Sequence, residues 1–164
     1  MSSIKVELTG DADNLISKLQ GLSAANKQGV LESIAEGLRT STIERFEEQR
    51  DPDGDRWVPS IRASETGGKT MTETAALRNS IHTEVSGNGL AIGTNDIRAA
   101  TLQYGAERTI RARNSKYLTF KQGGQWRRVK SVHVRIPSRP FLGISRQDEQ
   151  NIKEQLEELF KENS

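Results

Sequence analysis

Apolar and polar positions alternate over residues 4–8, which is typical of a short half-buried strand. Asp11 or Asp13 then offers a helix cap ahead of an apolar stripe at Leu15, Ile16, Leu19 and Leu22. A longer helix is predicted by the next stripe, whose members are Val30, Leu31, Ile34, Leu38, Thr42, Ile43 and Phe46. This helix should end before residue 51, because Asp51-Pro52-Asp53-Gly54 combines a helix-disfavouring proline with turn residues.

Residues 59–74 hold Ser, Thr, Gly and charged residues with almost nothing to bury, so we predict a long mobile loop there. Ordered structure should resume at 75–81 and lead into a hairpin that turns at residues 86–89. Residues 99–104 predict a short helix that Gly105 closes.

Three further strand-like runs, 117–120, 126–129 and 132–136, precede Pro137 and Pro140. Gly123-Gly124 is expected to turn the first two into a hairpin. An amphipathic pattern predicts a C-terminal helix over 147–161. The order of elements predicts an α+β fold, with an antiparallel β-sheet flanked by N-terminal helices and a C-terminal helix, in one domain over residues 1–164.

Composition narrows the function classes. Only 33% of the 164 residues are apolar, so we expect a thin core and polar surfaces that need a partner. The absence of cysteine excludes disulfides, thiolate metal sites and cysteine nucleophiles. Neither an 18-residue apolar run nor an apolar leader occurs, so a soluble intracellular product is expected, without membrane contact.

The formal net charge of +2 is unevenly distributed. Residues 105–140 hold ten Lys or Arg and one acid, a net charge of +9, whereas the rest of the chain carries −7. The ten basic residues are Arg108, Arg111, Arg113, Lys116, Lys121, Arg127, Arg128, Lys130, Arg135 and Arg139. Such asymmetry indicates an interaction surface for nucleic acid or for the acidic part of an identical subunit, and charge alone does not choose between them.

The candidate phosphate-binding and metal-binding motifs do not have the residue spacing that such sites require. Gly68-Lys69-Thr70 resembles the end of a phosphate-binding loop, but the position five residues before Gly68 is Ala63. The aspartates around Gly54 resemble a calcium loop whose glycine falls at the wrong position. His82 and His133 have no further ligands at metal-binding spacing. No catalytic residue, metal or cofactor is predicted.

Two features look specific. Trp57 follows a polar turn, where an indole either folds back on the core, which we favour, or docks onto a partner. Residues 135–143 form a proline-stiffened connection in which Phe141 is expected to fill the core, leaving Arg135 and Arg139 free for a surface role.

Together these landmarks resemble the phage virion morphogenesis family, which includes tail completion (tail S) proteins and the G-like proteins of Mu-type contractile-tailed phages. The similarity runs from about residue 30 to the C-terminus. The residues that carry it are Phe46, Pro52, Asp53, Gly54 and Trp57, the runs 77–81, 92–94 and 104–105, and Pro137, Arg139, Pro140, Phe141, Leu142 and Gly143.

The resemblance implies a structural assembly protein rather than an enzyme, which completes or terminates the tail and helps join it to the head. Similar tail terminator and neck proteins form rings, often hexameric, beside the tail tube and the head–tail connector. The protein would then occur in the virion, and in the host cytoplasm during assembly.

A ring of identical subunits needs two different complementary faces, which the basic segment and the acidic remainder would provide. We predict that Trp57 and nine of these basic residues, all but Lys116, form this interface; the basic segment could also meet DNA in the ring lumen. The alternative is a nucleic-acid-binding module without sequence specificity, in which Tyr117, Phe120 and Trp126 stack on bases. Against it, these aromatics fall on strand positions that a sparse core needs.

Overall fold

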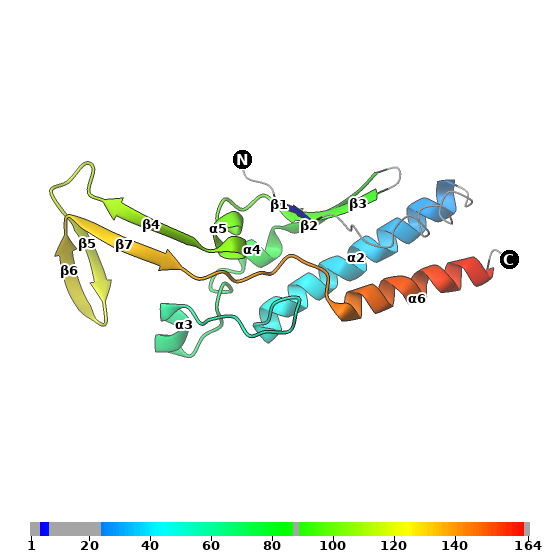
Figure 1. Cartoon of the computed structure of the whole chain (residues 1–164), viewed down its shortest axis with the longest axis horizontal. Helices are drawn as coiled ribbons and strands as arrows, with labels where there is room; N and C mark the ends of the chain where they lie inside the picture. Colours follow the sequence, from blue (N-terminus) through cyan, green and yellow to red (C-terminus); the bar gives the residue numbers. More distant parts are fainter. Residues whose placement is uncertain (1–3, 7–23, 87–88, 163–164) are drawn as a thin grey trace.

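The chain is elongated, with a pair of helices at one end and a projecting β-arm at the other (Figure 1). The structure is a computed structural model that describes residues 4–6, 24–86 and 89–162. The predicted N-terminal strand is confirmed as β1 (Ile4–Val6). The helix predicted over residues 15–22, with its Asp11 or Asp13 cap, lies outside the described residues.

The helix pair consists of α2 (Ala24–Glu48) and α6 (Arg146–Glu162), both close to their predicted bounds. Leu31, Ile34 and Leu38 on the predicted stripe of α2 are buried. Leu156 of α6 belongs to the same hydrophobic cluster, so the two helices share one core.

A three-stranded antiparallel sheet covers α2, with the strand order β1-β3-β2. The predicted hairpin is confirmed as β2 (Ile81–Ser86) and β3 (Gly89–Thr94). Its register pairs Ile81 with Thr94 and Thr83 with Ile92, which places the apolar positions of both strands on the face toward α2.

Two of the segments that carried the family resemblance, 46–57 and 137–143, pack against each other in the core. Phe46 lies between Trp57 and Phe141, with ring centroids 5.4 and 5.5 Å away. A Cβ on Gly143 would stand 2.6 Å from Cγ of Pro52, so the helix-end turn and the connector approach too closely for a side chain there.

Residues 59–74 are not an unstructured loop, which corrects the prediction. They contain α3 (Ile61–Thr66), and α4 (Ala76–Asn79) follows. Ser60 caps α3 by accepting a hydrogen bond from the Ala63 N–H, and Gly67 ends it in the left-handed conformation. These local cap residues, rather than an apolar stripe, define the helix.

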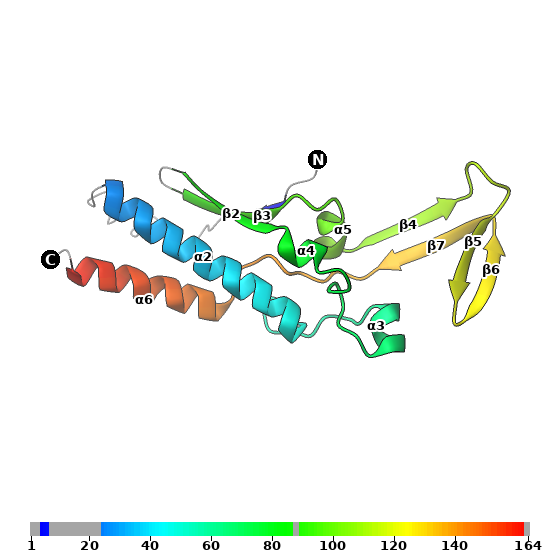
Figure 2. The ribbon, with the colours of Figure 1, turned by 180° about the vertical axis from the view of Figure 1, so that it is seen from behind.

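The arm starts after α5 (Ala99–Tyr104), the predicted short helix closed by Gly105. It pairs β4 (Ala106–Arg111) with β7 (Ser131–Ile136) in an antiparallel ribbon. A second hairpin, β5 (Leu118–Gln122) and β6 (Gln125–Val129), lies at its far end (Figure 2). The fold is α+β as predicted, but the antiparallel strands of the described residues are divided among three sheets, and β4 was not predicted.

Candidate interaction surface

The arm carries most of the predicted interface residues on exposed positions. Its β5–β6 hairpin, called the tip below, turns at Gly123 and Gly124, both with positive φ. The exposed predicted residues of the arm are Arg108, Arg111, Arg113, Lys121, Arg127, Arg128, Lys130 and Arg135. The structure therefore gathers eight of the ten predicted interface residues on one projecting element.

The tip also exposes an indole. Trp126 pairs across the hairpin with Lys121 and is 72% exposed, so the expectation that the core needs this ring is wrong. The Arg128 guanidinium lies 5.1 Å from the centroid of the Tyr117 ring, and Lys116 Nζ lies 5.8 Å from it. The tip thus combines exposed cations with aromatic surface.

Trp57 and Arg139 are placed differently from the other eight predicted residues. Trp57 is 5% exposed and donates through Nε1–H to the Pro140 carbonyl at 2.8 Å. Arg139 is 6% exposed and donates through Nε to the Val58 carbonyl at 2.6 Å. Burial lowers the pKa of the Arg139 guanidinium. Both side chains are occupied inside the subunit, so their prediction as surface interface residues is corrected, while the favoured core position of Trp57 holds.

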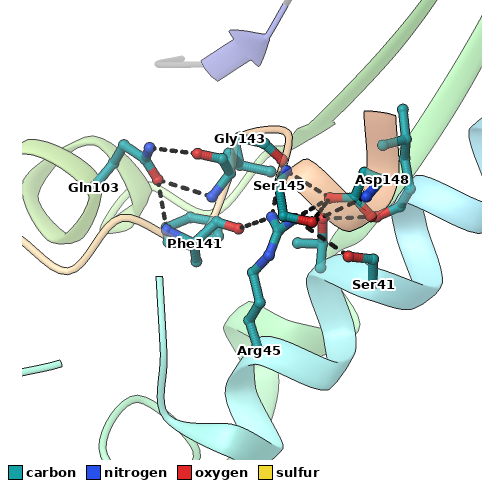
Figure 3. Close-up of polar contacts among 10 residues, drawn as sticks. Ser41, Arg45, Gln103, Phe141, Gly143, Ser145 and Asp148 are labelled. Carbon is teal, nitrogen blue, oxygen red and sulfur yellow. Dashed lines mark hydrogen bonds and ion pairs between the residues drawn. The ribbon is translucent and has the colours of Figure 1, made fainter. Parts of the chain in front are cut away.

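Residues 137–143, called the connector below, join the arm to α6 and are fixed through their backbone. Four consecutive carbonyls, from Pro140 to Gly143, accept hydrogen bonds from side chains of other elements. Gln103 of α5 binds the connector with both ends of its amide: Oε1 accepts from the N–H groups of Phe141 and Leu142, and Nε2 donates to the Leu142 carbonyl (Figure 3). The arm is therefore held by side-chain hydrogen bonds rather than by a sheet.

Arg45 of α2 supplies the donors on the other side (Figure 3). Its Nη1 donates to the carbonyls of Phe141 and Gly143 at 3.0 and 2.9 Å, and its Nη2 lies 2.6 Å from Asp148 Oδ2. Burial lowers the pKa of Arg45, an effect that the Asp148 carboxylate opposes. Asp148 also accepts from the backbone N–H of Ser145, whose hydroxyl caps the Asp148 N–H at the start of α6.

At the root of the arm, the backbones of Gly105 and Ile136 lie close together beside a cavity. Gly105 has a φ of +75°, and a Cβ there would stand 2.8 Å from the Ile136 carbonyl oxygen. The cavity measures about 620 Å³ and is lined by apolar residues such as Leu77 and Ile136 together with four arginines. The one acid in its lining, Glu73, lies 3.3 Å from Arg62, so the lining presents cations and apolar surface.

The sequence analysis did not identify Arg45, Gln103 and Asp148 as buried residues, because polar residues on short or amphipathic helices are usually exposed to solvent. Two signals were available: Arg45 falls on the apolar stripe of α2, and Ser145-x-x-Asp148 is a capping-box pattern. Among the described residues, no three His, Asp or Glu side chains gather as metal ligands. None of the helices in the described ranges has the length and apolarity that a membrane crossing requires.

The profile of the phage virion morphogenesis family matches residues 8–161. The curated Mu-like prophage FluMu G protein 2 of Haemophilus influenzae (strain ATCC 51907 / DSM 11121 / KW20 / Rd) is 28% identical over 160 residues, which cover 96% of each chain. No solved structure matches the chain at a significant level.

Proposed function

The chain belongs to the phage virion morphogenesis family, and we propose that it is a structural subunit that completes or terminates the phage tail and helps join it to the head. In this role it acts as a homo-oligomeric ring, with six subunits as the favoured number, between the tail tube and the head–tail connector. Its role is assembly rather than catalysis, and its place is the neck of the virion after assembly in the host cytoplasm.

The observation that supports a ring is the spatial separation of unlike surfaces. The exposed cations of the arm lie at one end of the elongated subunit, and the helix pair lies at the other (Figure 2). A contact between two different ends of identical subunits is heterologous, and such contacts close into rings when the rotation permits. A ring also presents the connector with a surface that differs from the end of the tail tube.

Light scattering tests the ring. The solution mass is measured at about 0.1 M and about 1 M NaCl, between which the Debye length falls from about 10 Å to about 3 Å. A mass several times 18.2 kDa that falls toward the monomer at high salt is expected, and electron microscopy of the low-salt sample should show closed rings. A monomer across the accessible concentrations, with no rings in the images, contradicts self-assembly of the ring.

A genetic experiment tests the place in assembly. Deletion of the coding sequence from the phage that carries it should leave filled heads and unjoined tails in lysates, and the gene supplied in trans should restore joined particles. Normal infectious particles from the deletion contradict the proposed role.

A second candidate function is DNA binding without sequence specificity, which the 72% exposure of Trp126 favours because exposed aromatics among cations can stack on bases. Neutralising Arg127, Arg128 and Lys130 separates the two functions. If the arm binds DNA, DNA retention is lost and the solution mass is unchanged. If the arm binds a neighbouring subunit, the mass falls.

A further inference from the structure

The two faces of the arm differ in chemistry. Residues directly opposite each other in an antiparallel ribbon share a face. One face pairs Glu107 with Arg135 and Thr109 with His133, and there His133 Nε2 lies 2.8 Å from Glu107 Oε1. Glu107, Thr109 and His133 thus form one hydrogen-bonded row on this polar face.

The opposite face, called the apolar face below, consists of Ala106, Ile110, Val132, Val134 and Ile136, with Arg108 among them. Within the described ranges, β4 and β7 pack extensively only on each other, and Ile110 is 39% exposed. At the arm root this face continues into the cavity, because Arg108 and Ile136 line both. A two-stranded ribbon is marginally stable by itself in water, so covering this face would stabilise the arm.

The tip has cations without partners. In the described part of the chain, Lys121, Arg127 and Lys130 make no hydrogen bond or ion pair through their side chains, and Arg128 contacts only the Tyr117 ring. Three basic side chains on one short hairpin, with Lys130 directly after it, repel each other. An acidic partner would relieve this repulsion.

The complementary charge lies on α6. Its exposed surface carries four carboxylates, Glu149, Glu154, Glu157 and Glu158, against Arg146, Lys153 and Lys161. The far end of α6 and the tip are at opposite ends of the subunit (Figure 1). Because the arm lies at the other end of the subunit from α6, these carboxylates can meet the tip only if they belong to a second copy of the chain.

We infer that the arm docks on a second copy of the chain, with its apolar face turned toward that copy and the cations of its tip on the exposed carboxylates Glu154, Glu157 and Glu158 of α6. This inference rests on the proposed self-assembly and names the two surfaces that meet. It accounts for an arm that carries exposed cations and an apolar face that is only partly covered in the isolated subunit.

Charge exchange tests the docking. R127E/R128E should remove assembly at low salt, raising the protein concentration at half-assembly by about tenfold or more, because like charges would then face each other. Adding E157R/E158R to the same chain should restore the wild-type mass. Circular dichroism of each variant checks that the fold is kept, since all four positions are exposed.

R146E/K153E is the matched control, because it changes the net charge by the same amount but adds acid to α6. Here assembly should persist and resist salt better than in the wild type. A second pair tests the faces of the ribbon: I110D should weaken assembly, whereas T109D, one residue away on the polar face, should keep it.

Each other outcome has a distinct meaning. If the wild type assembles and R127E/R128E keeps the same mass, the docking inference is overturned while the ring stands. If the mass is unchanged and retention on duplex DNA is lost, the arm is a nucleic-acid surface and the inference is also overturned. Failure of E157R/E158R to restore assembly excludes α6 as the partner surface, and loss of assembly in R146E/K153E overturns local complementarity. A monomeric wild type overturns the proposed ring and the docking with it.

Discussion

Nη2 of Arg45 lies 2.6 Å from Oδ2 of Asp148, and the two side chains are 6% and 4% exposed. This buried ion pair joins the C-terminal end of α2 to the start of α6, and the same Arg45 side chain also holds the connector. Removing one partner of such a pair leaves a buried charge without its counterion.

Asp148→Asn should therefore lower the free energy of unfolding by about 3–5 kcal/mol, since Arg45 stays charged in the core. Urea denaturation followed by circular dichroism measures the change. Glu149→Ala, at the exposed neighbouring position, serves as the control and should stay within about 0.5 kcal/mol of the wild type. Equal effects of the two substitutions would contradict a structural role for the pair.

Substitution of each tryptophan by phenylalanine should separate a buried indole from an exposed one. Trp57→Phe keeps a ring beside Phe46 but leaves the Pro140 carbonyl without its donor, which should cost about 1–3 kcal/mol. Trp126→Phe should change stability by less than about 0.5 kcal/mol. Urea denaturation of both variants measures the difference, and a large loss only in Trp126→Phe would reverse the assignment.

Gly105→Ala should destabilise the arm root. The positive φ alone costs about 1–3 kcal/mol for a non-glycine residue, and the new methyl would also press on the Ile136 carbonyl oxygen. Gly29→Ala, in an open position on α2, is the contrasting change and should raise stability by about 0.5–1 kcal/mol. Thermal unfolding of both variants tests the prediction, which a neutral Gly105→Ala would refute.

Glu47 should contribute stability only where its carboxylate is ionised. The hydrogen bond from Lys69 lowers the pKa of Glu47 below its ordinary value of 4.5, and it is the largest cause. The positive charges of Lys69 and Arg78 lower this pKa further. A carboxyl group with a lowered folded pKa stabilises the fold above its unfolded pKa, and this contribution disappears as the pH falls through the folded value. Glu47→Gln should thus be less stable than the wild type at pH 7 and equal to it near pH 2, measured by urea midpoints; a constant gap would exclude the ionic contribution.

The periodic elements could be predicted from the sequence because their apolar spacing reflects a shared core. The stripe ending at Phe46 predicts α2 for this reason, and the turn residues 86–89 predict the hairpin of β2 and β3. β4 escaped prediction because Arg108 interrupts its apolar face, and the strand exists only through pairing with β7. α3 depends on Ser60 and Gly67 rather than on periodicity.

The charge of the candidate interaction surface could be predicted from the sequence, but not which of the basic residues are exposed on it. The clustering of basic residues along the sequence identifies the arm, because the arm contains nearly all of segment 105–140. Charge alone does not distinguish Arg139, which turns inward to backbone carbonyls, from Arg127, which stays exposed. The inward turn depends on the Val58 carbonyl, 81 positions away along the chain.

The four carbonyls of the connector set a limit on how the chain length can vary. Trp57, Arg45 and Gln103 reach their acceptors at successive residues, so deleting or inserting one residue between Pro140 and Gly143 would shift every acceptor away from its donor. The turn at Gly123 and Gly124 meets no other part of the described chain within 4 Å of an added Cβ, so it can lengthen without disturbing the rest of the subunit. Inserted sequence at the tip should therefore leave the fold of the subunit intact, whereas inserted sequence in the connector should disrupt it.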